Sequence, residues 1–419
     1  MNDKYTYDSN ASITTRVIGT TAIRYEYLED IMEPVIDKIR KNEKIIFHVD
    51  LEGILYGLYR KKDLPAIMES DYDTLVKDIV VGVINVLAHY RKYFASYIGV
   101  DNEVFVYWNY KLPGYQGAYY PDYRSSTYEK YSKKNIDFGV VYQATRQAAE
   151  MISNLLQYVE GMYWVDNAKY DTYTAIAYTM GTKKYSKYYH LIFSRTMILS
   201  QLVGKRVAQL VHGRQRDVDE NGVAQYTSKG SYLITTANVY KKAFFTSKQK
   251  PWDIQLPTYY VPIVWTLSKY SDMGVNKLVF GKVPDTIHHL EILYLGKKIG
   301  DESNIRTVVE ALIEDAPKFF PKDKDEQEVV IQKAIDRYKV LNLKLAAKGI
   351  SKAQVLSMYR GVVDLYDQNA LEKLNSQLTA EDARSTILDI AALNQSYAVR
   401  RYTTRRQDEK FILVHNEEM

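Results

Sequence analysis

The sequence predicts an α/β protein with a mostly parallel sheet flanked by helices, followed by a C-terminal all-helical extension. Two observations support this fold class. Up to about residue 320, strand-like apolar runs alternate with helical patterns, an order typical of a parallel sheet covered on both faces. Beyond that point only helical patterns remain. With 419 residues, the chain is long enough for one large α/β unit and an appended part.

The elements before residue 265 follow from hydrophobic periodicity and turn residues. The segment 111–134 is rich in Gly, Pro, Tyr and Lys and is predicted to be an exposed loop, or arch. Parallel strands end at one edge of a sheet, where ligand sites collect, so we expect Asp50, Trp108, Asp166 and Ser194 to lie at that edge. The predicted elements are helices over 25–40, 72–97 and 140–158, and strands over 45–49, 103–108, 161–165, 190–193 and 231–235.

In the C-terminal part, an amphipathic helix is predicted over 325–348, ending at Gly349. The spacing of Ser351–Gln354 then predicts the start of another helix, and Thr379 that of a further one. A basic group lies at Arg400–Arg406. The predicted units are an N-terminal extension (1–40), the α/β domain (41–265), a helical-hairpin region (266–320) and the helical extension (321–419).

Composition excludes several classes of function. The chain has no Cys, which excludes disulfides, thiol catalysis and Cys-ligated metal sites. Its seven His form no HExxH motif, and no GxGxxG or P-loop pattern occurs. Met1–Tyr5 has no apolar signal-peptide core, and no run of about 18 apolar residues could span a bilayer. We therefore expect a soluble intracellular protein, and the net charge of +5 permits a polyanionic partner.

Four segments, taken in order, resemble motifs of one nuclease family. Tyr119–Ser126 resembles a Tyr-Pro-x-Tyr-Lys arch segment, and Lys169–Ala177 a Tyr-Glu-Ala-x-Asp helix start. Phe193–Leu202 resembles a strand followed by Ser-x-Asp-x-Asp and Gln-Leu, and Leu267–Val275 a Gly-Asp-x-x-Asp-Asn motif. Together they are similar to the flap endonuclease and 5′-3′ exonuclease family, which is PIN-like, in its small phage (RNase H) form. The resemblance implies a PIN/flap-endonuclease-like domain.

The resemblance also implies that most metal-binding acids of the family are replaced. Asp50, Asp171 and Asp272 match acids of the family's motifs. Non-acidic residues stand at the other positions: Trp108 or Asn109, Thr174, Thr196, Ile198 and Lys269. Two-metal hydrolysis requires carboxylate ligands that hold the ions and offset their charge. We therefore expect no catalytic residues, no bound metal and no cofactor.

Each retained acid also has a structural interpretation. Asp50 is either a ligand left from an ancestral site or an Asp that caps the turn after its strand. Asp171 and Asp272 are interpreted in the same way, as acids that cap helix N-termini. Under an alternative with one metal ion, Asp50, Asp166 and Asp171 are the candidate ligands of a single Mg²⁺.

The arch is the best candidate for nucleic-acid binding, because its basic and aromatic residues alternate as single-stranded nucleic acid requires. A solvated loop is the alternative. The hairpin that grips duplex DNA in the family has a close Gly pair, which Gly274–Lys282 lacks. The candidate binding residues are Lys111, Tyr120, Tyr123, Arg124, Lys130, Lys133 and Lys134.

These observations lead to one functional hypothesis and two alternatives. The hypothesis is a phage-encoded pseudo-nuclease, retained for nucleic-acid binding or as a structural subunit of a viral nucleoprotein or virion assembly. The alternatives are a divergent 5′ nuclease with a one-metal site, and a structural subunit that binds only proteins. The expected partners are single-stranded or flapped DNA and other viral proteins, not a membrane. The expected location is the host cytoplasm or the virion.

Overall fold

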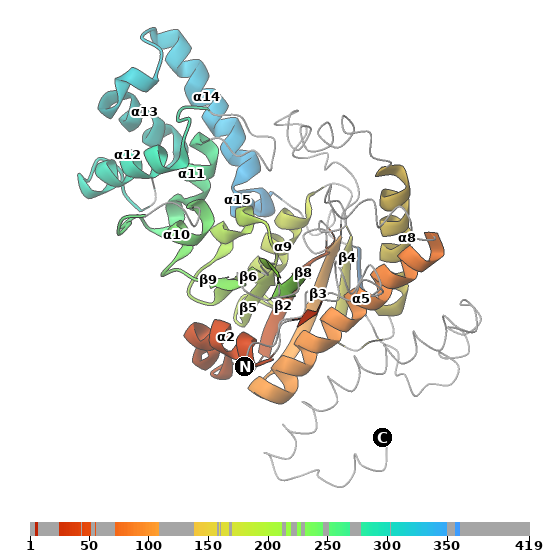
Figure 1. Cartoon of the computed structure of the whole chain (residues 1–419). Coiled ribbons are helices and arrows are strands. Elements are labelled where there is room, and N and C mark those ends of the chain that lie inside the picture. Colours follow the sequence, from red (N-terminus) through yellow and green to blue (C-terminus); the bar gives the residue numbers. More distant parts are fainter. Residues whose placement is uncertain are drawn as a thin grey trace, which may run out of the picture.

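The computed structural model of the chain describes residues 5–6, 25–42, 44–51, 55, 72–108, 138–156, 159, 161–166, 170–211, 215–218, 224–227, 231–245, 251–268, 278–301, 303–349 and 357–360. Its main feature is a seven-stranded sheet of order β10-β4-β3-β2-β5-β6-β9 (Figure 1). The central pairs are parallel and both edge pairs are antiparallel. This confirms the predicted α/β class. The strands are β2 (Lys44–Asp50), β3 (Asp101–Trp108), β4 (Met162–Asp166), β5 (Tyr189–Phe193), β6 (Val207–Val211), β9 (Tyr232–Ile234) and β10 (Ser357–Arg360).

Strand β2 lies at the centre of the sheet and is buried on both faces. Ile45, Phe47 and Val49 point into one hydrophobic core. Ile46 points into the other core, and His48 and Asp50 share its face because side chains alternate along a strand. Burial on both faces explains why this strand is a nearly continuous apolar run in the sequence.

The first core lies between the sheet and helices α2 (Tyr25–Arg40), α5 (Tyr72–Lys92) and α8 (Phe138–Leu156) (Figure 1). All three helices were predicted, with small differences at their ends. Helix α5 continues into a π-helical turn, η3 (Tyr93–Ile98), which ends at Gly99. Gly99 has a φ of 75°, a left-handed conformation that a glycine adopts without steric cost.

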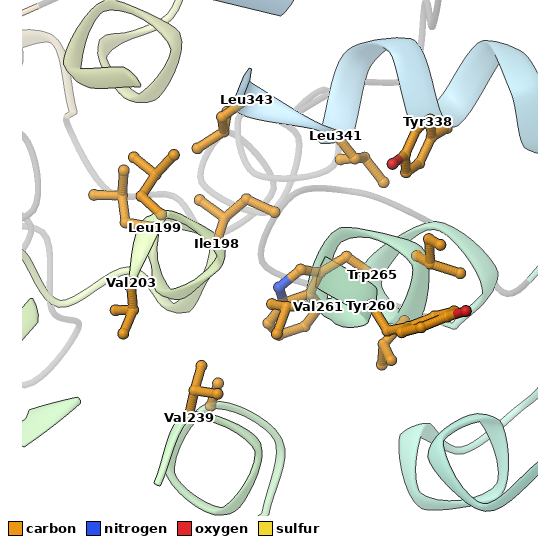
Figure 2. Packing of buried hydrophobic residues seen from close by; sticks show 14 of the residues in the cluster. Ile198, Leu199, Val203, Val239, Tyr260, Val261, Trp265, Tyr338, Leu341 and Leu343 are labelled. Atoms are coloured by element: carbon orange, nitrogen blue, oxygen red, sulfur yellow. The ribbon is translucent and has the colours of Figure 1, made fainter. Parts of the chain in front are cut away.

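The second core lies on the opposite face and extends far beyond the sheet. Figure 2 shows its apolar side chains coming from several short elements. In Figure 1, α10 to α14 gather at the upper left of the sheet, with α9 and α15 closer to it. The elements are α9 (Thr172–Gly181), η4 (Met197–Leu202), α10 (Val239–Phe244), η5 (Thr258–Tyr260), α11 (Val261–Leu267), α12 (Val283–Leu295), α13 (Ile305–Asp315), η7 (Pro317–Phe319), α14 (Lys324–Leu341) and α15 (Leu343–Lys348).

The C-terminal part differs from the prediction at two places. The helix predicted over 325–348 is divided at Asn342, whose side chain accepts a hydrogen bond from the Leu345 amide and so caps α15. The helix predicted from Ser351 is wrong over Ser357–Arg360, which forms β10 on the edge of β4. Pairing with a distant strand overrides the local capping pattern there. The helix predicted from Thr379 lies outside the described residues.

A second, small sheet was not predicted. It has the order β1-β8-β7, with bounds β1 (Tyr5–Thr6), β8 (Ala224–Thr227) and β7 (Gln215–Val218). Within the described ranges, no helix has the length and apolar character needed to cross a bilayer.

Gln201 joins the α14–α15 junction to the α/β part. Its side chain is 5% exposed and lies in η4. The Nε2 amide donates to the carbonyl oxygens of Ile198 and Leu341, both at 2.9 Å. The Oε1 atom accepts from the Leu343 amide, also at 2.9 Å. One buried amide thus pairs backbone groups on both sides of the break between the two helices.

We expect Gln201→Leu to lower the free energy of unfolding by about 1–3 kcal/mol, because it leaves buried backbone groups of Leu341 and Leu343 unpaired. Urea unfolding followed by circular dichroism measures this decrease. Gln332→Leu is the matched control, since Gln332 is exposed on α14. Equal destabilisation by the two substitutions would contradict the proposed role of Gln201.

Candidate functional site

The carboxyl ends of four neighbouring parallel strands meet at one edge of the sheet, as predicted. Strands β2, β3 and β4 end at Asp50, Trp108 and Asp166, and Ser194 directly follows β5. Asp50 lies opposite Tyr107, and Trp108 lies opposite Asp166. Trp108 points into the first core, away from the face that carries Asp50. The structure therefore brings Asp50 and Ser194 together and leaves Trp108 outside the site.

Asp50 is fully buried and its carboxylate has a close partner. The Ser194 hydroxyl donates to Asp50 Oδ2 at 2.5 Å and accepts from the Thr196 amide at 3.1 Å. Gln209 of β6 donates to the Thr196 carbonyl at 2.8 Å. Side chains and backbone of three adjacent strands thus form a connected polar group at this edge. Ser194 lies in one of the four motifs, but its bond to Asp50 was not predicted.

Asp171 has the structural role considered for it from the sequence, that of capping a helix N-terminus. It is the N-cap of α9, and its Oδ1 atom accepts a hydrogen bond from the Thr174 amide at 2.7 Å. Both side chains are buried. A carboxylate at this position pairs a free amide and interacts favourably with the helix dipole.

The two positions that resemble the family's Asp-x-Asp pair have separate environments. Thr196 is half-buried and precedes η4. Ile198 is fully buried in the second core, where Figure 2 shows it between Leu199 and the side chains around Trp265. A carboxylate at position 198 would place a charge among apolar side chains, which is strongly unfavourable without a partner.

Among the described residues, the oxygen ligands at this edge are fewer than a two-metal site uses. Across the part of the chain that the structure describes, no three His, Asp or Glu residues lie close enough together to hold an ion. Asp50 accepts from Ser194 and Asp171 caps a helix. Two ions bound by oxygen ligands need several carboxylates. Asp272, Lys269, Asn109, the side chain of Asp166 and all the predicted arch residues lie outside the described groups.

Next to Asp50, on the same face of the sheet, lies a buried chain of hydrogen bonds that the sequence analysis did not predict. His190 Nε2 is 3.1 Å from the Tyr185 carbonyl oxygen, and His190 Nδ1 is 2.9 Å from His48 Nε2. His48 Nδ1 is 2.8 Å from the Tyr107 hydroxyl. The chain crosses β5, β2 and β3. In the sequence, the sign of this chain is His48, a titratable residue within an apolar run.

The donor directions in this chain follow from its carbonyl end. A carbonyl oxygen accepts only, so His190 Nε2 carries the proton and donates. In a neutral ring His190 Nδ1 then accepts from His48 Nε2, and His48 Nδ1 accepts from the Tyr107 hydroxyl. Every hydrogen bond is therefore satisfied when both rings are neutral. An added proton on either ring would break one of them.

Burial keeps these groups uncharged. It lowers the pKa of His190 to about 4 and holds the pKa of His48 well below its usual value of 6.5, and the nearby His190 lowers it further. Burial also raises the pKa of the Tyr107 hydroxyl. The His190–His48–Tyr107 chain beside Asp50 therefore consists of neutral groups that are hydrogen-bonded to one another.

The chain is similar in structure to several solved proteins. Neither a protein-family model nor the sequence of a curated protein matches the chain. A complex of a variant bacteriophage T5 flap endonuclease with DNA and metal ions aligns over 84% of this chain and 99% of its own, with 9% identity and a TM-score of 0.46. The zinc-bound T5 5′-exonuclease aligns over the same shares with 9% identity and a TM-score of 0.44. These similarities concern the fold alone.

We expect the protein to lose stability between pH 6.5 and pH 4. In this range the unfolded chain protonates His48 and His190, and the folded chain does not. The stabilisation is therefore complete above pH 6.5 and decreases as the pH falls. The lowered pKa of His190 corresponds to about 3 kcal/mol of free energy of unfolding that is lost as the pH falls through this range. Urea unfolding at several pH values measures the slope.

The control for this prediction is a variant in which both rings are removed. His48→Gln with His190→Gln should be less stable at pH 7 but should flatten the pH dependence between 7 and 5. His288→Gln, at an exposed position, should leave the slope unchanged. The explanation fails if the double variant retains the slope of the wild type.

Proposed function

We propose that the chain is a catalytically inactive flap-endonuclease-like protein that binds nucleic acid. The observation that supports inactivity is the use of the retained acids in the fold. Asp50 is fully buried beside Ser194, and Asp171 caps α9. Ile198 occupies a core position where the family's motif has an acid. A pair of divalent ions needs more carboxylates than the described residues of this edge supply.

The nucleic-acid part of the proposal rests on the composition of the arch. Lys111, Arg124 and the lysines near residue 130 alternate with tyrosines, which suits phosphate binding together with base stacking. Single-stranded or flapped DNA is therefore the proposed ligand, and no cofactor is proposed. A phage origin, a place in the host cytoplasm or virion, and viral protein partners are further parts of this proposal, and they rest on the four motifs.

Loss of catalysis predicts that purified protein does not cleave labelled flap or single-stranded DNA in Mg²⁺ or Mn²⁺ above the level of Asp50→Asn. Gel analysis of the labelled products over several hours measures this. Asp285→Asn is the matched control, because Asp285 is an exposed acid at the start of α12. Cleavage that Asp50→Asn abolishes and Asp285→Asn preserves would establish the alternative, a divergent one-metal nuclease.

Binding through the arch predicts affinity for single-stranded DNA at low salt that decreases steeply as salt rises. Lys130→Ala, Lys133→Ala and Lys134→Ala together should reduce the slope of log affinity against log salt. The reduction is about 0.7 for each phosphate that the variant no longer neutralises, or about 2 in all. Fluorescence anisotropy of a labelled oligonucleotide measures both the affinity and the slope.

The charge-matched control for the arch variant removes three exposed lysines elsewhere, Lys241, Lys322 and Lys333, and should leave the slope unchanged. No detectable binding by the wild type at 50 mM salt would contradict the proposal. That result would favour the other alternative, a structural subunit without nucleic-acid affinity.

A further inference from the structure

The segment between Asp171 and Asp217 contains no acid and eight basic residues. The whole chain has a net charge of +5, so the rest of the chain carries more acids than bases. Five of the eight lie in two turns, one before β5 and one before β6. These five exposed residues, here called the amino-edge patch, are Lys183, Lys184, Lys187, Lys205 and Arg206.

The two turns are adjacent because β5 and β6 are parallel neighbours, with His190 opposite Val207. Arg206 Nη1 donates to the Lys187 carbonyl at 2.8 Å, and the His190 amide donates to the Arg206 carbonyl at 2.8 Å. The patch therefore lies at the amino ends of the strands. The five residues of β5 separate it from Ser194 by roughly 16 Å.

The turns that carry the patch are held by local hydrogen bonds. The amides of Tyr185 and Ser186 both donate to the Thr182 carbonyl, at 3.0 and 2.9 Å. Gly204 and Val207 exchange backbone hydrogen bonds at 3.0 and 3.2 Å. The charged side chains thus project from a fixed backbone, which lowers the entropy cost of binding a ligand.

The patch has no acidic partner within the described part of the chain. None of its five residues forms an ion pair with a described Asp or Glu. The acids at the amino ends of the neighbouring strands are already bound, since Lys44 contacts Asp101 at 3.4 Å and Glu103 at 2.7 Å. Five cations in two adjacent turns attract a polyanion.

The aromatic rings at the patch are not available for base stacking. Tyr185 and Tyr189 are buried, and Tyr188 is half-buried with the Lys187 ammonium 4.8 Å from its ring centre. The Lys184 ammonium donates to the Tyr185 hydroxyl at 2.7 Å. Single-stranded ligands are held by stacking as well as charge, whereas a duplex presents mainly its phosphates.

We propose that the amino-edge patch binds the phosphate backbone of duplex DNA. This surface lies at the opposite ends of the strands from the carboxyl edge of the sheet, its residues are not those of the predicted arch, and it needs neither metal nor catalysis. The sugar-phosphate backbone supplies regularly spaced negative charges that the five exposed cations can neutralise. Binding is therefore sequence-independent and salt-dependent.

The test is anisotropy of a labelled 30-base-pair duplex with the full-length chain, titrated between 50 and 300 mM KCl. Lys183→Ala, Lys187→Ala and Lys205→Ala together leave Arg206 and Lys184 in their hydrogen bonds. Each phosphate that the variant no longer neutralises should reduce the slope of log affinity against log salt by about 0.9, or about 3 in all. At 50 mM KCl the affinity should fall at least about tenfold.

Two controls make the result specific. The variant lacking Lys241, Lys322 and Lys333 has the same charge removed elsewhere and should bind the duplex with the wild-type slope. The arch variant should also retain the duplex slope, so failure of the arch proposal leaves this one intact. Circular dichroism checks that the patch variant is folded.

Three results would overturn the proposal. The first is a wild-type protein that does not bind the duplex at 50 mM KCl. The second is a patch variant with the wild-type slope. The third is a patch variant that binds the duplex normally but no longer binds polyglutamate or no longer self-associates in sedimentation, since the partner would then be an acidic protein or a second copy of this chain.

Discussion

Burial of β2 on both faces is the constraint on which the rest of the structure depends. A strand covered by two cores cannot leave a polar side chain without a partner, because the cost of burying an unpaired polar group is several times the gain from a typical hydrogen bond. His48 and Asp50 are fully buried. Each is bonded to a residue of a neighbouring strand, His48 to His190 and Tyr107, and Asp50 to Ser194. The parallel register that aligns these strands is thus also what satisfies their polar groups.

The same constraint explains how a buried carboxylate is accommodated at Asp50, where no cluster of acids is found among the described residues. A cluster of acids needs cations to offset their mutual repulsion, whereas a single carboxylate needs only donors. Ser194 supplies one such donor, and the Thr196 amide and Gln209 fix the position of that loop. Ile198, in the first turn of η4, then completes the second core. The loop after β5 therefore supplies a hydrogen-bond donor to Asp50 and an apolar side chain to the second core.

Local patterns in the sequence predict much of this fold. Helix α2 and strands β2 and β3 follow from periodicity, and the position of Asp50 at the carboxyl edge follows from the parallel order of the strands. Strand β10 does not, because it forms by pairing with β4 far earlier in the chain. The hydrogen bond between His48 and His190 joins residues 142 positions apart, so no local spacing predicts it. For the same reason the sequence shows an isoleucine at position 198 but not the core that it fills.

The two edges of the sheet differ in how their polar and charged side chains are paired. At the carboxyl edge Asp50 accepts a hydrogen bond from the Ser194 hydroxyl, and Asp171 accepts one from the Thr174 amide. At the amino edge five cations project from two hydrogen-bonded turns without an acidic partner among the described residues. One acid-free segment supplies Ser194 and Thr196 at the carboxyl edge and the five cations at the amino edge. An acid-free segment contains no carboxylate that would compete with phosphates for its cations, which suits the direct binding of a polyanion.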